Sequence, residues 1–132
     1  MDAIRVLVVD DETQFVATVV KRLARRDIDA SGADCGRAAL AALALRPCDV
    51  VILDVKMPGM DGLETLREIK RLYPDVEVVM LTGHATAESG GLGMSLGAFD
   101  YLMKPADLDD LVEKIRQAHE RCEINRGKRP EA

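Results

Sequence analysis

"VVILDVKMPGMDG", at residues 50–62, is where an apolar run of the chain meets a carboxylate. Residues 50–53 are all aliphatic, which is typical of a strand buried on both faces of a parallel sheet. Asp54 follows directly, and burying an ionised carboxylate is costly unless something pairs with it. Asp54 either ends the strand at a polar site or caps the next turn. Residues 57–62 supply turn chemistry of their own, which favours the polar site.

Apolar runs and helical patterns alternate on both sides of this stretch. The third strand is therefore expected at residues 49–53, and the other four at residues 4–9, 28–33, 76–81 and 99–103. The 3/4 spacing of apolar residues predicts helices at residues 12–26, 37–45, 63–72, 85–96 and 108–119. This alternation predicts an α/β fold with a single doubly wound five-stranded parallel sheet, covered on both faces by five helices.

Composition and charge exclude several classes of protein. The chain has 132 residues, of which 48% are hydrophobic, and this is enough for one core of ordinary size. No apolar run approaches the roughly 18 residues that span a bilayer, and residues 1–5 do not resemble the start of a signal peptide. We therefore expect a soluble, cytoplasmic protein with no membrane partner. The net charge of −5 argues against direct nucleic-acid binding.

Polar side chains follow four of the expected strands, at the ends where parallel α/β sheets bind ligands. They are Asp10 and Asp11 after the first strand, Asp54 after the third, Thr82 after the fourth and Lys104 after the fifth. If these strands are neighbours, three carboxylates share one small area with a lysine and a hydroxyl group. Clustered carboxylates repel one another, so their ionised state requires a countercharge.

A magnesium ion suits this arrangement because Mg²⁺ takes oxygen ligands and keeps several of its waters. The expected ligands are Asp11, Asp54 and a nearby backbone carbonyl, with Asp10 acting through water. A carboxylate beside Mg²⁺ and Lys104 is well placed to accept a phosphoryl group, because both cations neutralise charge on its oxygens. Thr82 can donate its hydroxyl to the same oxygens. The residues therefore indicate a phosphoacceptor site.

Each of these residues also has a structural interpretation. Asp10 or Asp11 can cap the first helix, since aspartate is a favoured N-cap residue. Lys104 taken alone is a solvated lysine, and Thr82 taken alone is a cap or a strand residue. Tyr101 is by default a half-buried aromatic of the fifth strand. The position of Lys104, after the fifth strand and before a proline, favours the functional interpretation.

Four motifs in sequence order give the chain a family resemblance. They are Asp10-Asp11, "ILDVKMPGMDG" at 52–62, "VVMLTGH" at 78–84 and "GAFDYLMKP" at 97–105. With these motifs at these spacings, the chain resembles the receiver domains of two-component response regulators over residues 4 to about 119. The resemblance implies a flavodoxin-like sheet with strand order 2-1-3-4-5.

The resemblance also implies a role for each site residue. Asp54 is the aspartate that is phosphorylated, and Asp10 and Asp11 form the acidic Mg²⁺ pocket. The backbone of Lys56 completes the coordination of the metal. Further roles fall to Thr82 as the switch hydroxyl, Lys104 as the phosphate-binding lysine and Tyr101 as the aromatic whose rotamer follows phosphorylation. Family members often have a cis bond at the position of Lys104-Pro105.

A receiver domain is a signalling switch rather than a metabolic enzyme. The implied partner upstream is a histidine kinase or phosphotransfer protein, and phosphorylation changes the surface around the fourth and fifth strands and helices. The implied partner downstream is another protein or a missing output domain. Whether the domain forms a homodimer is left open. A phosphatase or phosphotransferase that forms an aspartyl phosphate is a weaker alternative, because its second acidic group would stand where this chain has Lys56. A nucleotide-binding module would need a glycine-rich loop, which residues 9–12 lack.

The sequence places the receiver domain at residues 1–120 and a polar tail or linker start at residues 121–132. The tail is expected to be disordered or to extend the last helix. Whether the chain stands alone or belongs to a longer regulator is left open. Residues 88–97 carry three interior glycines, each of which costs about 1 kcal/mol of helix propensity. We hypothesise that this fourth helix is frayed without phosphate and orders on activation.

Overall fold

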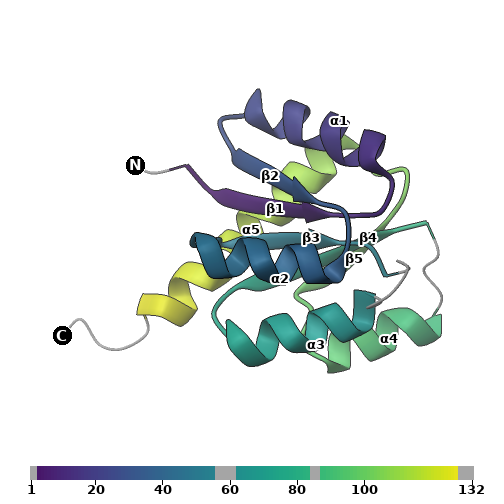
Figure 1. The fold of residues 1–132 in the computed structure, drawn as a ribbon, viewed down its shortest axis with the longest axis vertical. Helices are drawn as coiled ribbons and strands as arrows, with labels where there is room; N and C mark the ends of the chain where they lie inside the picture. The colour runs from purple at the N-terminus through teal and green to yellow at the C-terminus, as the bar shows by residue number, and fades with distance from the viewer. Residues whose placement is uncertain (1–2, 56–61, 84–86, 128–132) are drawn as a thin grey trace.

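The computed structural model describes residues 3–55, 62–83 and 87–127 and contains one five-stranded sheet. Its strands are β1 (Arg5–Val9), β2 (Asp29–Ala33), β3 (Val50–Leu53), β4 (Glu77–Thr82) and β5 (Asp100–Met103). The helices are α1 (Thr13–Ala24), α2 (Gly36–Leu45), α3 (Gly62–Leu72), α4 (Ala87–Ser95) and α5 (Leu108–Gly127). All paired strands are parallel and run in the order β2-β1-β3-β4-β5, which confirms the predicted topology (Figure 1).

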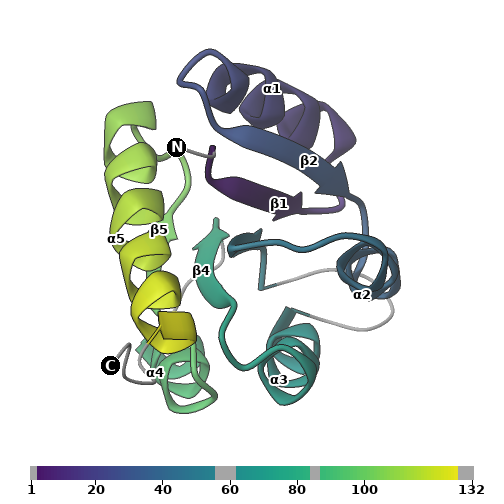
Figure 2. The same ribbon diagram turned by 90° about the vertical axis from the view of Figure 1, so that its left-hand side faces the viewer.

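Two apolar layers flank the sheet, and alternate strand residues face them. Val6 and Val8 of β1 belong to a core shared with α1 and α5, whereas Leu7 and Val9 belong to a core shared with α2 and α3. Figure 2 shows these helix pairs on opposite faces of the sheet. Every residue of β3 is buried, as predicted for a central strand. Close packing on both faces fixes the position of the residue that comes directly after β3.

A tight turn connects α1 to β2 at the edge of the sheet. Asp27 has a φ of 62°, a left-handed conformation that aspartate adopts more readily than most residues. The Ile28 amide donates to the Leu23 carbonyl at 3.1 Å and closes the end of α1. The edge strand β2, directly after this turn, is polar and largely exposed. A short polar edge resists pairing with another sheet.

The predicted fourth helix is present as α4, despite its glycines. A Cβ atom built on Gly93 would lie 2.5 Å from the Met80 sulfur of β4. This glycine therefore allows α4 to approach the sheet closely, whereas a Cβ on Gly91 would meet no atom within 4 Å. The proposed ordering of α4 on phosphorylation stays a prediction.

Helix α5 is the longest element and continues beyond the predicted domain boundary at residue 120. Residues 121–127 extend the helix, which is one of the two expected alternatives for the tail, while residues 128–132 lie outside the described part of the chain. Cys122 in this extension is fully buried. Despite its 20 residues, α5 is too polar to cross a membrane, and no other described helix can do so.

Candidate functional site

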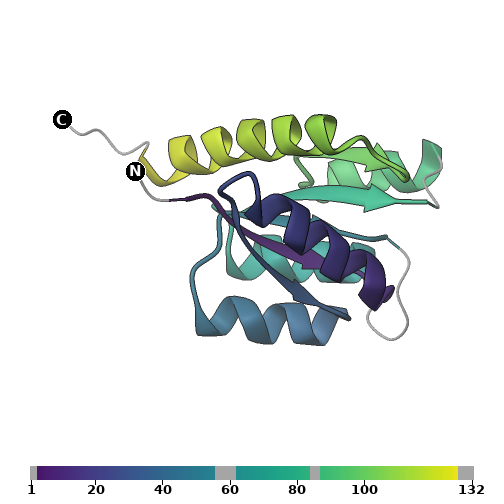
Figure 3. The same cartoon turned by 90° about the horizontal axis from the view of Figure 1, so that it is seen from above.

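The parallel strands deliver the predicted site residues to one edge of the sheet. Backbone hydrogen bonds continue the strand pairing past the strand ends. The Asp10 amide donates to the Ala33 carbonyl at 3.2 Å, and the Asp54 amide donates to the Val9 carbonyl at 3.0 Å. The Lys104 amide donates to the Thr82 carbonyl at 2.9 Å. The backbone of each of these residues is thus fixed to a neighbouring strand at the end where the arrowheads point in Figure 3.

Three carboxylates converge at this edge, as the sequence predicted. One oxygen from each of Asp10, Asp11 and Asp54 lies within 4.8 Å of the other two. Asp10 is 1% exposed and Asp54 is 5% exposed, whereas Asp11 is open to solvent. The Glu12 amide donates to Asp10 Oδ1 at 2.9 Å, so Asp10 also shapes the turn into α1. Glu12, and neither aspartate, occupies the N-cap position of α1.

Lys104 connects the acidic side chains of the site. Its Nζ atom donates to Asp10 Oδ2 at 2.6 Å and to Glu12 Oε1 at 2.9 Å. The same Nζ atom lies 3.8 Å from Asp54 Oδ2. It also lies 4.3 Å from the centre of the Phe15 ring, within the range of a cation–π contact. Lys104 is therefore an internal countercharge of the cluster rather than a solvated lysine.

The electrostatic balance of the site shows in the pKa of Lys104. Burial lowers this pKa, but hydrogen bonds to Asp10 and Glu12 and the charges of Asp10 and Asp54 raise it. The net effect raises the pKa of the Lys104 ammonium above its usual value, so this group stays charged at neutral pH. One ammonium group faces the carboxylates of Asp10, Asp11, Glu12 and Asp54, which leaves a negative balance among these five side chains.

The donor set of the cluster fits a hard divalent cation. Its ligand atoms are carboxylate oxygens, which Mg²⁺ prefers, and exposed Asp11 leaves an open side where coordinated waters can remain. Asp10, Asp11 and Asp54 could hold such an ion. Lys56, whose backbone is expected to complete the coordination, lies outside the described residues.

Thr82 and Tyr101 lie on the adjacent strands β4 and β5. Thr82 is fully buried at the end of β4. Tyr101 pairs in register with Met80, and its partly buried side chain packs against the core beneath α2 and α3. The peptide bond between Lys104 and Pro105 is cis, as expected from the family resemblance.

The sequence reasoning assigned no site role to two residues that lie against Lys104, although Glu12 directly follows Asp10-Asp11 after the first strand. Glu12 accepts a hydrogen bond from Lys104, and Phe15 lies beneath the same ammonium group. Both belong to the start of the first predicted helix, where the apolar spacing assigns them no role beyond the helix itself. Their position within four residues of Asp11 was the available signal, because the first turn of this helix must lie beside the same strand end.

Comparison with known proteins identifies the family of this chain. Residues 6–116 match the family model of the response regulator receiver domain. A relative from Salmonella typhimurium, the DNA-binding transcriptional regulator NtrC, is 37% identical over 113 residues. That match covers 86% of this chain and 24% of the relative. A putative NtrX-like response regulator from Rickettsia bellii is 37% identical, and its match covers 98% of this chain and 27% of the relative.

Solved structures agree with this assignment. A CheY-like receiver domain protein from Methanospirillum hungatei superimposes with a TM-score of 0.89 at 29% identity, covering 94% of this chain and 99% of that one. The receiver domain of NtrX from Brucella abortus superimposes with a TM-score of 0.82 at 35% identity, covering 87% and 98%. The present chain spans about a quarter of the length of the curated relatives. It belongs to the response regulator receiver domain family of two-component signalling systems.

Proposed function

We propose that Asp54 accepts a phosphoryl group from a phosphohistidine on a histidine kinase or phosphotransfer protein. The observation that carries this proposal is the placement of Asp54 between two further carboxylates and the ammonium of Lys104. A buried carboxylate in a negative cluster is poorly placed for stability alone. It is well placed for a reaction in which cations stabilise an added phosphoryl group.

The proposed transfer is a displacement at phosphorus. An oxygen of the Asp54 carboxylate attacks the phosphorus, and the new O–P bond gives an aspartyl phosphate. The P–N bond breaks, and the imidazole leaves and takes up a proton from water. Mg²⁺, held by Asp10, Asp11, Asp54 and the backbone of Lys56, would neutralise charge on the phosphoryl oxygens.

Residues of the neighbouring strands support the same role. Lys104, whose Nζ lies 3.8 Å from Asp54 Oδ2, binds the phosphoryl oxygens. Thr82, buried at the end of β4, turns its hydroxyl to the phosphoryl group, and Tyr101 changes rotamer in response. The result is a two-state change in the surface formed by β4, α4, β5 and α5. The domain thereby assists its own phosphorylation and its slow dephosphorylation.

The proposed receiver unit is residues 1–120, and residues 121–132 begin a linker. We propose that the unit works in the cytoplasm and passes its signal to a downstream protein or an output domain, as a monomer or a homodimer. The support for an output domain is the length of the relatives, of which this chain spans about a quarter. Direct contact with nucleic acid or membrane is not part of the proposal.

The test is the mass of the intact protein after incubation with acetyl phosphate, with and without Mg²⁺. We expect a single Mg²⁺-dependent phosphoryl adduct on the unmodified chain and no adduct on Asp54→Asn. Asp34→Asn is the matched control, because Asp34 is an exposed aspartate outside the cluster, just after β2. An adduct that persists in Asp54→Asn, or is lost in Asp34→Asn, would contradict the proposed acceptor.

A further inference from the structure

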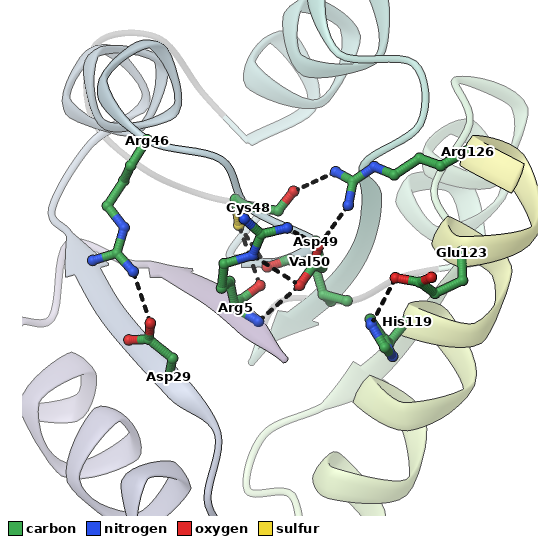
Figure 4. Close-up of polar contacts among 9 residues, drawn as sticks. All are labelled: Arg5, Asp29, Arg46, Cys48, Asp49, Val50, His119, Glu123 and Arg126. Carbon is green, nitrogen blue, oxygen red and sulfur yellow. Dashed lines mark hydrogen bonds and ion pairs between the residues drawn. The ribbon is translucent and has the colours of Figure 1, made fainter. Parts of the chain in front are cut away.

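A second polar cluster lies at the opposite end of the sheet, where β3 begins. Asp49 Oδ1 accepts hydrogen bonds from Arg5 Nη2 at 2.8 Å and from Arg126 Nη1 at 2.6 Å. Arg126 Nη2 also donates to the Cys48 carbonyl at 2.8 Å. Figure 4 shows the two arginines approaching Asp49 from different sides, Arg126 from the end of α5. The contact between Arg126 and Asp49 joins residues that lie 77 positions apart in the chain.

The residue before Arg126 makes a matching contact with the next strand. Asn125 Nδ2 donates to Glu77 Oε2 at 2.8 Å, and Glu77 is the first residue of β4. One turn earlier, Cys122 is 0% exposed. The end of α5 thus contacts the two residues before β3 and the first residue of β4. Asp54 directly follows the other end of β3, and Thr82 is the last residue of β4.

The contacts that hold α5 change character along the helix. Four apolar residues of its first turns are buried in the core shared with α1: Leu111, Val112, Ile115 and Ala118. Beyond them, Cys122 is the last buried residue of the described helix, and Ile124 is 57% exposed. The last two turns therefore depend on one small apolar side chain and on the polar contacts of Asn125 and Arg126.

Asp49 and Glu77, which accept hydrogen bonds from the end of α5, would each keep another neighbouring cation if this end of the helix were released. Asp49 Oδ2 accepts from the Arg5 amide at 2.9 Å and from Arg5 Nε at 3.3 Å, in addition to the bond at Oδ1. Glu77 Oε1 lies 3.7 Å from Lys70 Nζ of α3. After release of α5, Asp49 and Glu77 would therefore each still have a neighbouring cation. Release would avoid the usual cost of breaking a buried ion pair, which is to leave a buried charge without a partner.

We propose that residues 122–127 of α5 form a releasable latch that docks the exit of the chain onto the amino ends of β3 and β4. In the docked state, Arg126 and Asn125 fix the direction in which the chain leaves the domain. In the released state, the helix stays anchored by its apolar turns and its end is free to reorient. The latch lies at the edge of the sheet opposite the acidic cluster and does not depend on the proposed phosphoryl transfer.

The test is the alkylation rate of Cys122 by N-ethylmaleimide in the full chain, followed by peptide mass mapping. We expect Arg126→Ala to speed alkylation at least about tenfold, because lost hydrogen bonds to a charged group shift an opening equilibrium by that order. Arg121→Ala is the matched control, since Arg121 is an exposed arginine of the same helix. Its alkylation rate should equal that of the unmodified chain.

Hydrogen exchange of the Val50–Leu53 amides separates release from unfolding. Under the proposal these amides keep their protection in Arg126→Ala while Cys122 becomes reactive. Equal Cys122 rates in the unmodified chain, in Arg126→Ala and in the Asn125→Ala/Arg126→Ala double variant would overturn the latch. Loss of β3 protection together with Cys122 protection would also overturn it, because the helix end would then be an integral part of the fold.

Discussion

The two ends of β3 use aspartate in opposite ways. At the carboxyl end, Asp54 lies with Asp10 and Asp11, and Lys104 brings one positive charge to the three carboxylates. At the amino end, Asp49 lies between the guanidinium groups of Arg5 and Arg126. The first arrangement has an excess of negative charge, and the second has an excess of positive charge.

The contrast between the two ends shows how one fold separates stability from chemistry. Both Asp49 and Asp54 are almost fully buried, so burial alone does not distinguish them. Their partners do: two arginines complete the ion pairing of Asp49, whereas the cluster around Asp54 gains from a further cation. The four residues of β3 hold the two carboxylates apart, which lets each end be changed by mutation without direct contact with the other.

We expect the largest effect on stability from removing the charge of Asp49 at the amino end of β3. Asp49→Asn should lower the free energy of unfolding by about 3 kcal/mol, because two buried or half-buried arginine contacts lose their charged partner. Arg5 and Arg126 are each about a third exposed, which keeps the loss at the lower end of that range. Urea denaturation followed by circular dichroism measures the change. A loss below about 1 kcal/mol, the size of an exposed ion pair, would mean that Asp49 is not a stabilising centre.

In the unmodified chain, acidic pH should lower the stability of the fold by protonating Asp49 at the amino end of β3. Burial opposes ionisation of Asp49, but hydrogen bonds from Arg5 and Arg126 outweigh it and lower its pKa from 3.8 to about 2. The depressed pKa contributes roughly 2 kcal/mol of stability above about pH 5, and this is lost as the pH falls towards about 2. Urea midpoints measured from neutral to acidic pH should show this loss. Asp49→Asn should lack that component, and identical pH profiles for the two chains would contradict the assignment.

At the carboxyl end of β3, we expect a mutation to change the affinity for Mg²⁺ rather than to lower the free energy of unfolding. Asp11→Asn should weaken Mg²⁺ binding about tenfold, which is about 1.4 kcal/mol, because the cluster loses one charged oxygen ligand. Without Mg²⁺ the same change should leave the free energy of unfolding unchanged or slightly raised, since it relieves repulsion. Calorimetric titration of Mg²⁺ measures the affinity, with Asp34→Asn as the control. If Asp11→Asn binds Mg²⁺ as tightly as the unmodified chain does, the metal site must lie elsewhere in the molecule.

The smallest expected effect isolates the role of burial at the amino end. Arg46 Nη2 donates to Asp29 Oδ2 at 2.8 Å, but both side chains are about half exposed (Figure 4). Asp29→Asn should therefore change the free energy of unfolding by less than about 0.5 kcal/mol. The same urea experiment used for Asp49→Asn measures it. A cost comparable to that of Asp49→Asn would show that position at this end matters more than burial.

The fold and the acidic cluster were predictable because their signals are local. The aliphatic run before Asp54 predicted a central strand, and the topology rule then brought Asp10, Asp11, Thr82 and Lys104 to the same edge. Parallel strands share their carboxyl ends, so the cluster required only that these strands be neighbours, and the family resemblance implied that order.

The amino-end cluster was not predictable in the same way. Asp49 and Arg126 are 77 positions apart, and no local pattern links an aspartate before a strand to an arginine in a polar tail. After Ala118 the apolar spacing of α5 weakens to the single small residue Cys122, so the residue pattern of the tail did not indicate a docked helix clearly. Such contacts depend on the packed positions of whole elements, which the residue pattern does not encode.

The meeting of Arg5 and Arg126 on Asp49 bears on protein engineering. Because both arginines bind one carboxylate, the first strand and the last helix of the described chain begin and end side by side. Domains with adjacent ends tolerate circular permutation and insertion into a loop of a host protein. A short linker between the two ends, with new termini opened elsewhere, would retain the sheet order. If the domain were inserted in a host enzyme, its two junctions with the host would lie close together, so a conformational change of the domain would reach the host through both.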